Sequence, residues 1–187
     1  MWICLQQLES PRSWFFGTPT LDDGQELALG VFTCGNQLDF DHLRIPLVSP
    51  GDALPISLAM QTIPVLTDSA ADFFLQQLRD DIQLIPCTTA MGASLWLCNV
   101  LTVLDCLDYN NTRAEYYPAN YPLKHLANHL KLAFEIVLVS SQVGSHRLFR
   151  LRADPLKLVT SASFLESLNA AGHIGLEPCA IPRYRCS

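Results

Sequence analysis

Two histidines, His125 and His129, lie four residues apart in a segment whose apolar residues recur at helical spacing. On a helix such a pair projects from one face, and two neutral imidazoles placed this way can bind zinc. The metalloprotease form of this motif needs a glutamate directly after the first histidine, where this chain has Leu126. Because the spacing implies no third ligand, we favour a polar helix face and expect no bound metal.

The chain contains seven cysteines, with no Cys-x-x-Cys pair, and five histidines. A Cys–His pair could act as a nucleophile if the thiol lay at a helix N-terminus or beside a basic group. Cys4, Cys87 and Cys98 instead lie within apolar runs, as reduced core residues do. Since the nucleophile elbow, the phosphate-binding loop and the dinucleotide fingerprint are also missing, we predict no catalytic residue and no cofactor. A small Cys/His-dependent hydrolase is the alternative.

Two groups of charged residues could form binding sites. Asp105 and Asp108 are three residues apart and could act as paired carboxylates, although shaping the loop after a strand is the simpler role. Arg147, Arg150 and Arg152 lie close together, and the last two fall on one face of a predicted strand. They could bind an anionic group or an acidic partner. We favour the alternative that they pair with acidic residues in the first half of the chain.

The charges are divided unevenly along the chain. Hydrophobic residues make up 49% of the 187 residues and charged residues 16%, which excludes a mainly disordered protein. Residues 1–110 carry 13 acidic and three basic residues, whereas residues 111–187 carry five acidic and nine basic ones. The net charge of −6 argues against generic nucleic-acid binding.

No apolar run reaches the roughly 18 residues of a membrane span, and the first residues do not resemble a secretory signal. We therefore expect a cytoplasmic protein that binds neither nucleic acid nor membrane.

The elements expected to position these residues are helices and short strands. They do not alternate regularly in strand–helix–strand units. Extended segments are expected at residues 2–5, 27–33, 43–48, 82–87, 94–100, 135–139, 146–152, 156–160 and 174–179. Helices are expected at residues 69–80 and 121–134, with a short third helix capped by Ser161 or Ser163. This order predicts the α+β class: a mixed, mainly antiparallel sheet packed with two or three helices, plus a β-rich N-terminal part. We expect that part, residues 1–62, to be integrated with a core formed by residues 63–187.

From Pro64 onward, several local patterns follow one another in a characteristic order. They are Ile82-Gln-Leu-Ile-Pro86, Leu95-Trp-Leu-Cys-Asn-Val-Leu101, Asp105-Cys-Leu-Asp108, His146-Arg-Leu-Phe-Arg150, Leu158-Val-Thr-Ser161, Ala170-Ala-Gly172 and Gly175-Leu-Glu-Pro178. In this order the segment resembles a family of bacterial immunity proteins encoded beside polymorphic toxins, formerly classed as a domain of unknown function. Residues 111–145 and the first 60 residues depart most from the pattern, so a partner-specific surface is expected there.

The resemblance implies a non-catalytic immunity protein that binds a cognate toxin and neutralises it sterically. Such toxins serve bacterial competition, by contact or through type VI secretion, and this one would act in the cytosol, for instance as a basic nuclease. An acidic surface would speed the encounter with a basic toxin. The residues expected to contact the toxin are Asp39, Asp41, Asp105, Asp108, Tyr109, Glu115, Tyr116 and Tyr117. An enzyme that reverses the toxin's product and a metal-binding regulator are the alternatives, and a homo-oligomer is compatible with each.

Overall fold

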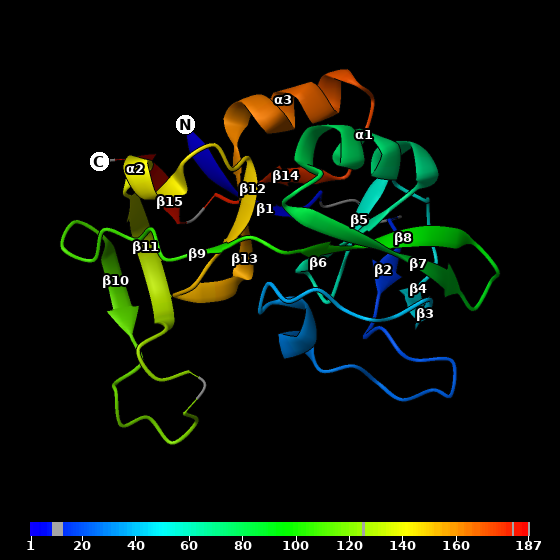
Figure 1. Cartoon of the computed structure of the whole chain (residues 1–187), viewed down its shortest axis with the longest axis horizontal. Helices are drawn as coiled ribbons and strands as arrows, with labels where there is room; N and C mark the ends of the chain where they lie inside the picture. Colours follow the sequence, from blue (N-terminus) through cyan, green and yellow to red (C-terminus); the bar gives the residue numbers. More distant parts are fainter. Residues whose placement is uncertain (9–12, 125, 181, 187) are drawn as a thin grey trace.

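The computed structural model describes residues 1–8, 13–124, 126–180 and 182–186. Within them the chain forms three β-sheets, three α-helices and one short 3-10 helix, η1 (Leu29–Phe32). The predicted α+β class with mixed sheets is confirmed. The largest sheet lies at one end of the molecule and the smallest at the other, with the third sheet between them (Figure 1).

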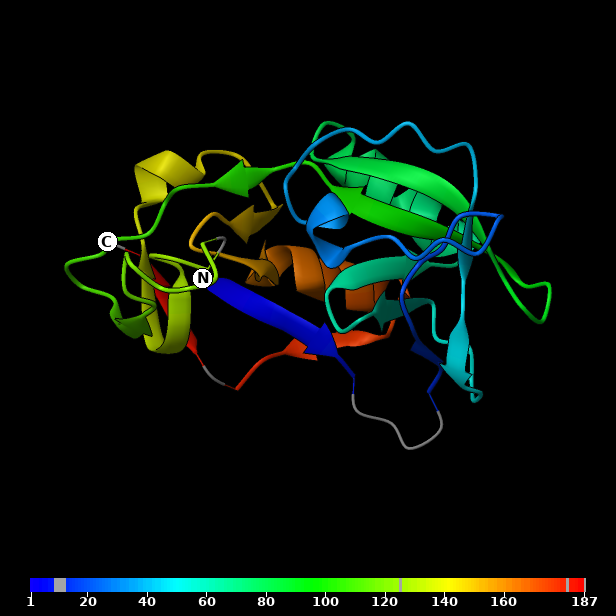
Figure 2. The same cartoon turned by 90° about the horizontal axis from the view of Figure 1, so that it is seen from below.

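The largest sheet has the strand order β3-β7-β8-β6-β5-β2-β4. Its strands are β2 (Phe15–Phe16), β3 (Leu43–Ile45), β4 (Leu47–Ser49), β5 (Ile56–Ala59), β6 (Ile63–Leu66), β7 (Ile82–Thr89) and β8 (Ser94–Val100). Only Pro46 separates the two edge strands, β3 and β4, which pair with β7 and β2 respectively. One extended segment therefore joins both edges, so the sheet is nearly closed and resembles a barrel. Figure 2 shows its cyan and green strands gathered at the end of the molecule opposite the small sheet.

Apolar residues are buried on both faces of this sheet. The interior of the barrel is filled by a cluster that includes Phe16, Phe32, Leu43 and Leu97. The opposite face carries a second cluster, in which Leu58 of β5 packs with residues of two helices. Burial on both faces explains why β5 and β6 are apolar at nearly every position instead of alternating.

The middle sheet has the order β14-β1-β13-β12-β9. Its strands are β1 (Trp2–Gln7), β9 (Val103–Leu104), β12 (Leu148–Leu151), β13 (Asp154–Ser161) and β14 (Leu176–Pro178). The strand nearest the N-terminus, β1, pairs antiparallel with β13 on one side and with β14 on the other. The first 62 residues thus contribute strands to two sheets that are completed by residues beyond position 63.

Two helices cover the same side of the structure (Figure 1). Helix α1 (Asp68–Leu78) buries Phe74, whose ring meets Phe164 of helix α3 (Ala162–Ala170) with 5.7 Å between centroids. Ser161 caps α3 by accepting a hydrogen bond from the Phe164 N–H, one of the two caps that the sequence suggested. None of the described helices has the length and apolar character that a bilayer span requires.

The third sheet is formed by β10 (Arg113–Tyr116), β11 (Leu130–Leu138) and β15 (Arg183–Cys186), in the order β10-β11-β15. The helix α2 (Ser140–Val143) follows β11 directly. Residues 104 to 107 lead into this sheet from β9, and Leu107 forms a single bridge to Leu138 of β11. Strand β10 lies at one edge of the sheet, and its other side pairs with no strand among the described residues.

Two predicted elements are wrong. In place of the expected helix over 121–134, the described residues form bends and turns at 122–124 and 126–129 and then β11, and Asn128 has a positive φ of 64°. The apolar residues whose spacing predicted this helix do not share one buried face, because Leu130 is buried whereas Leu123 and Phe134 are 51% and 43% exposed. The complete set is Leu123, Leu126, Ala127, Leu130 and Phe134. The expected strand over 27–33 instead contains η1, because Phe32 and Leu27 turn inward to fill the barrel.

Candidate functional site

The small sheet leaves large apolar side chains exposed on its outer face. Leu132 and Phe134 of β11 expose 47% and 43% of their surface. The guanidinium of Arg113 lies 5.7 Å from the centre of the Phe134 ring, and Lys131 pairs with Glu115 at 3.3 Å. The outer face therefore combines apolar area with charges that are free to rearrange at its rim.

Two pairs of tyrosine rings lie in or near β10. The rings of Tyr109 and Tyr116 lie 6.0 Å apart, and the Tyr109 hydroxyl donates to Asp105 Oδ1 at 3.4 Å. Burial, and then the nearby Asp105 carboxylate, raise the pKa of Tyr109 above its ordinary value, so the phenol stays a hydrogen-bond donor. A second ring pair, Tyr117 and Tyr121, has its centroids 4.6 Å apart.

The two predicted aspartates in this region have different roles. Asp108 accepts hydrogen bonds from the backbone N–H groups of Asn110 and Asn111, each at 3.2 Å, and from the Asn111 amide at 2.8 Å. It shapes the turn that leads to β10, which was the simpler role expected from the sequence. Asp105 is exposed, and its carboxylate accepts the hydrogen bond from Tyr109.

Six of the eight residues expected to contact a partner therefore surround one edge strand. We call this surface the β10 edge and define it as Asp105, Asp108, Tyr109, Glu115, Tyr116, Tyr117, Leu132 and Phe134. The other two expected residues, Asp39 and Asp41, are exposed on the loop that precedes β3 of the largest sheet. They belong to a different sheet from the β10 edge. Leu132 was not predicted as a contact residue from the sequence, and Phe134 was predicted to lie on the buried face of a helix.

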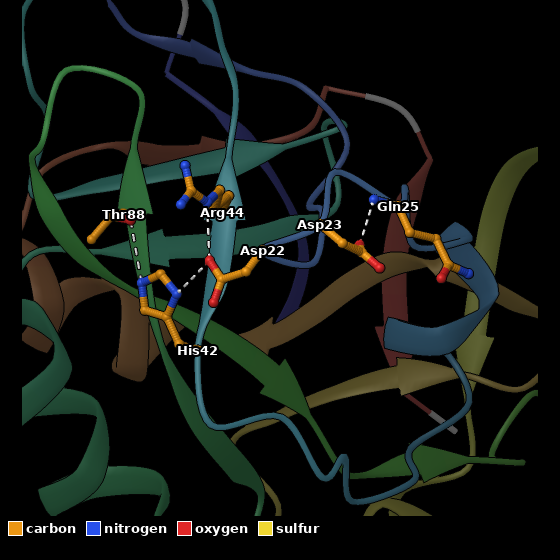
Figure 3. Close-up of polar contacts among 6 residues, drawn as sticks. All are labelled: Asp22, Asp23, Gln25, His42, Arg44 and Thr88. Carbon is orange, nitrogen blue, oxygen red and sulfur yellow. Dashed lines mark hydrogen bonds and ion pairs between the residues drawn. The ribbon is translucent and has the colours of Figure 1, made fainter.

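Another polar cluster joins the N-terminal loops to the barrel (Figure 3). Asp22 Oδ1 lies 3.0 Å from Arg44 Nε and 3.5 Å from His42 Nδ1, while His42 Nε2 lies 3.2 Å from the Thr88 hydroxyl. The hydrogen bond from Arg44 lowers the pKa of Asp22. Carboxylate, imidazole and hydroxyl follow one another as in a nucleophile relay, but Asp22 is shared with Arg44 and 64% of its side chain is exposed. The cluster fastens the loop to β3 and β7.

Comparison with known protein families places these features in context. Residues 86–181, just over half of the chain, match the sequence model of the immunity protein family Imm11. The chain belongs to this family. The matched segment lies within residues 64–187, where the local patterns resemble an immunity-protein family, and it contains all eight residues of the β10 edge, together with Arg150 and Gly175. A search among curated proteins found none that matches the chain.

Membership of Imm11 implies that the protein neutralises a toxin, and that its partner is that toxin. Immunity proteins of this kind are typically non-enzymatic. The thiols of this Imm11 protein agree with that description, because burial raises the pKa of Cys87 and Cys98 to about 12 and that of Cys106 to about 11. A buried thiol that stays protonated is a poor nucleophile. Cys179 differs from these three thiols in that its pKa is lowered.

The expected histidine pair is not presented by a helix in this Imm11 protein. His125 lies outside the described residues, and His129 follows a turn in which its N–H donates to the Leu126 carbonyl. Among the described residues, no group of three or more His, Cys, Asp or Glu side chains is arranged to hold a metal ion. His146 instead places Nδ1 2.6 Å from Asp81 Oδ1, which ties the loop before β12 to the end of α1.

Neither interpretation of the arginine group holds for Arg150, which is fully buried. Its Nη1 donates to the Thr62 hydroxyl and the Pro155 carbonyl, and its Nη2 to the Thr62 carbonyl, each at 2.9 Å. These acceptors are neutral, so Arg150 neither grips an anion nor pairs with an acid. Burial lowers its pKa to about 10, which leaves it charged at neutral pH. Arg147 also has neutral partners: it donates to Gln77 and lies over the Phe164 ring.

Proposed function

We propose that this Imm11 protein binds a cognate toxin in the cytosol through the β10 edge and neutralises it by steric obstruction. The observation that carries the proposal is the exposed pair Leu132 and Phe134 on β11, which pairs with the edge strand β10 in a sheet at one end of the molecule. Family membership supplies the kind of partner. Delivery of that toxin by contact or by type VI secretion belongs to the same proposal.

The composition of the β10 edge supports this role. Tyrosine and phenylalanine are enriched at the centres of protein interfaces, because their rigid rings bury a large area at a small cost in side-chain entropy. The Tyr109 hydroxyl remains a polar handle beside that area. The Lys131–Glu115 pair lies at the rim, where exposed charges contribute to orientation more than to affinity.

The position of β10 at the edge of its sheet also supports binding. An unpaired edge strand presents backbone N–H and C=O groups that a strand of another protein can complete. β10 is short, and register shifts interrupt its pairing with β11. Both features make non-specific strand pairing and aggregation at this edge less favourable. The edge is therefore suited to a partner whose side chains also fit Leu132 and Phe134.

Alanine substitutions with matched controls test the surface. Phe134→Ala and Leu132→Ala are each expected to weaken toxin binding about 30-fold, or about 2 kcal/mol, as for central interface residues. Phe15→Ala and Leu156→Ala serve as controls, since these residues are of the same type and are 38% and 48% exposed, but lie on other sheets. The controls should change the affinity less than threefold. Calorimetry with the toxin encoded by the adjacent gene measures all four.

Three outcomes would contradict the proposal. If the two control substitutions weaken toxin binding as much as Phe134→Ala and Leu132→Ala do, the β10 edge is not the binding surface. If the protein protects cells but forms no complex with the toxin, the steric mechanism is wrong. Protection at far less than one molecule per toxin would point to an enzyme that acts on the product of the toxin. Thermal melting of each variant excludes loss of folding as the cause.

Acidic residues away from the β10 edge are expected to act on the rate of encounter. The double variant Asp39→Lys/Asp41→Lys should slow association with a basic toxin several-fold at low salt and leave the dissociation rate nearly unchanged. Asp72→Lys/Glu166→Lys makes the same change in net charge on the exposed faces of α1 and α3 and should have a smaller effect. Stopped-flow measurements at several salt concentrations compare them. If both variants slow association equally, only the net charge matters and the loop before β3 has no special role.

A further inference from the structure

Two cysteines far apart in the sequence lie opposite each other on neighbouring strands. Cys4 lies within β1, and Cys179 follows the last residue of β14. The register pairs Leu5 with Pro178, and it continues to the cysteines, because the Cys179 N–H donates to the Cys4 carbonyl at 2.9 Å. Directly opposed residues of antiparallel strands project from the same face of a sheet, so the two thiols are neighbours.

The two thiols differ in their access to solvent. Cys4 is 1% exposed and belongs to the apolar cluster beneath the middle sheet. Cys179 is half-buried and, with Gln6 and Lys157, lines a cavity of about 770 Å³. A small reagent can therefore reach Cys179 through the cavity, whereas Cys4 can be reached only through Cys179 or by local opening of the sheet.

The two thiols also differ in acidity. A hydrogen bond with Cys4 lowers the pKa of Cys179 below its ordinary value, and the positive charge of Lys157 lowers it further against the effect of burial. The same hydrogen bond, together with burial, raises the pKa of Cys4. Cys179 is therefore the thiol of the pair that loses its proton more readily and supplies the reactive thiolate, whereas Cys4 holds its proton.

We propose that Cys4 and Cys179 are a redox-sensitive pair that forms a reversible cross-strand disulfide with a low-molecular-weight disulfide as oxidant. Opposed residues of such a ladder have Cα atoms about 5.5 Å apart, within the range of about 4.4–6.8 Å that a disulfide spans. The bond would join the N-terminal strand of the middle sheet to the segment that leads into β15 of the small sheet. This inference is independent of which surface binds the toxin.

The reaction proceeds in two exchange steps. The Cys179 thiolate attacks one sulfur of the oxidant, forms a mixed disulfide and releases one small thiolate, which takes up a proton. The Cys4 thiol then loses its proton to solvent and attacks the Cys179 sulfur, which releases the second small thiolate. The two protein thiols lose two electrons and the oxidant gains them. A pair that forms and breaks in this way fits a reducing compartment, where lasting disulfides are rare.

Incubation of the full-length protein with oxidised and reduced glutathione tests the proposal. Remaining thiols are blocked by alkylation, and the digest is mapped by mass spectrometry without reduction. We expect a Cys4–Cys179 linked peptide that disappears after treatment with dithiothreitol. We also expect Cys179→Ser to abolish the linked peptide, and Cys4→Ser to convert it into a glutathione adduct on Cys179.

The exposed Cys34 supplies the matched control, because Cys34→Ser should leave the yield of the linked peptide unchanged. Two results would overturn the proposal. A glutathione adduct on Cys179 of the unmodified sequence, with no linked peptide at any ratio, would show that Cys4 cannot complete the exchange. Alkylation of Cys179 no faster than that of Cys34 at neutral pH would show that Cys179 is not activated.

Discussion

Replacing Arg150 with methionine is expected to lower the free energy of unfolding by about 3 kcal/mol. The substitution removes three hydrogen bonds from a charged group and leaves the carbonyls of Thr62 and Pro155 buried without that donor. It also relieves the cost of burying a guanidinium whose Nε has no hydrogen-bond partner among the described residues. We expect the lost hydrogen bonds to outweigh this relief, because they join β12 of the middle sheet to the turn between β5 and β6 of the largest sheet.

Arg152→Met is the matched control. Arg152 lies two residues farther along, carries the same charge and is exposed, so its replacement should change the stability by less than about 0.5 kcal/mol. Urea unfolding followed by circular dichroism measures both variants, and the stability of Arg150→Lys should fall between that of Arg150→Met and that of the original chain. A stability for Arg150→Met equal to or above that of the original chain would show that desolvation dominates and that the arginine is not a structural tie.

Gly175→Ala is expected to be at least as damaging, with a loss of about 3–5 kcal/mol or a failure to fold. A Cβ atom at this position would lie 1.8 Å from the carbonyl oxygen of Ile56, and the residue has a φ of +154°. The alanine can be accommodated only if the loop before β14 moves away from β5. That movement would also strain the hydrogen bond from the Leu8 N–H to the Gly175 carbonyl.

Gly172→Ala is the control that shows the effect of a positive φ alone, without the close contact that an alanine at position 175 would make with Ile56. Gly172 has a φ of +82° just after α3, but nothing lies within 4 Å of its added Cβ. Its replacement should cost only about 1–2 kcal/mol for the left-handed conformation. Thermal melting of the two alanine variants, side by side, gives the comparison. If they melt at the same temperature, the contact between Gly175 and Ile56 does not constrain the fold.

Much of the fold could be predicted because local patterns agree with the final structure. The helix over 69–80 has one apolar face and polar residues on the other, and the structure has α1 there. The hairpin of β7 and β8 also follows its apolar runs and the intervening turn. Sequence periodicity failed over residues 121–134, where apolar residues at helical spacing do not share one buried face and the chain forms turns and the start of β11.

The candidate site was predictable only in part. The tyrosines and acids around β10 stood out because they cluster in the sequence, and the structure gathers six of them at one edge strand. Phe134 was misassigned because its position in a helix stripe would be buried, whereas in β11 it is exposed. The buried role of Arg150 depends on Thr62, which is 88 positions away in the sequence, and no local pattern carries that information.

The place of β1 between β13 and β14 sets a limit on when the protein can fold during its synthesis. Strand β1 leaves the ribosome long before its partners, because β13 begins only at Asp154, 147 residues after Gln7 at the end of β1, and β14 follows β13. At typical elongation rates of about 5–20 residues per second, β1 waits roughly 10–35 s for them. A newly made chain therefore cannot complete its middle sheet until β13 and β14 have both left the ribosome, and β1 stays without these partners while the strands of the largest sheet are made.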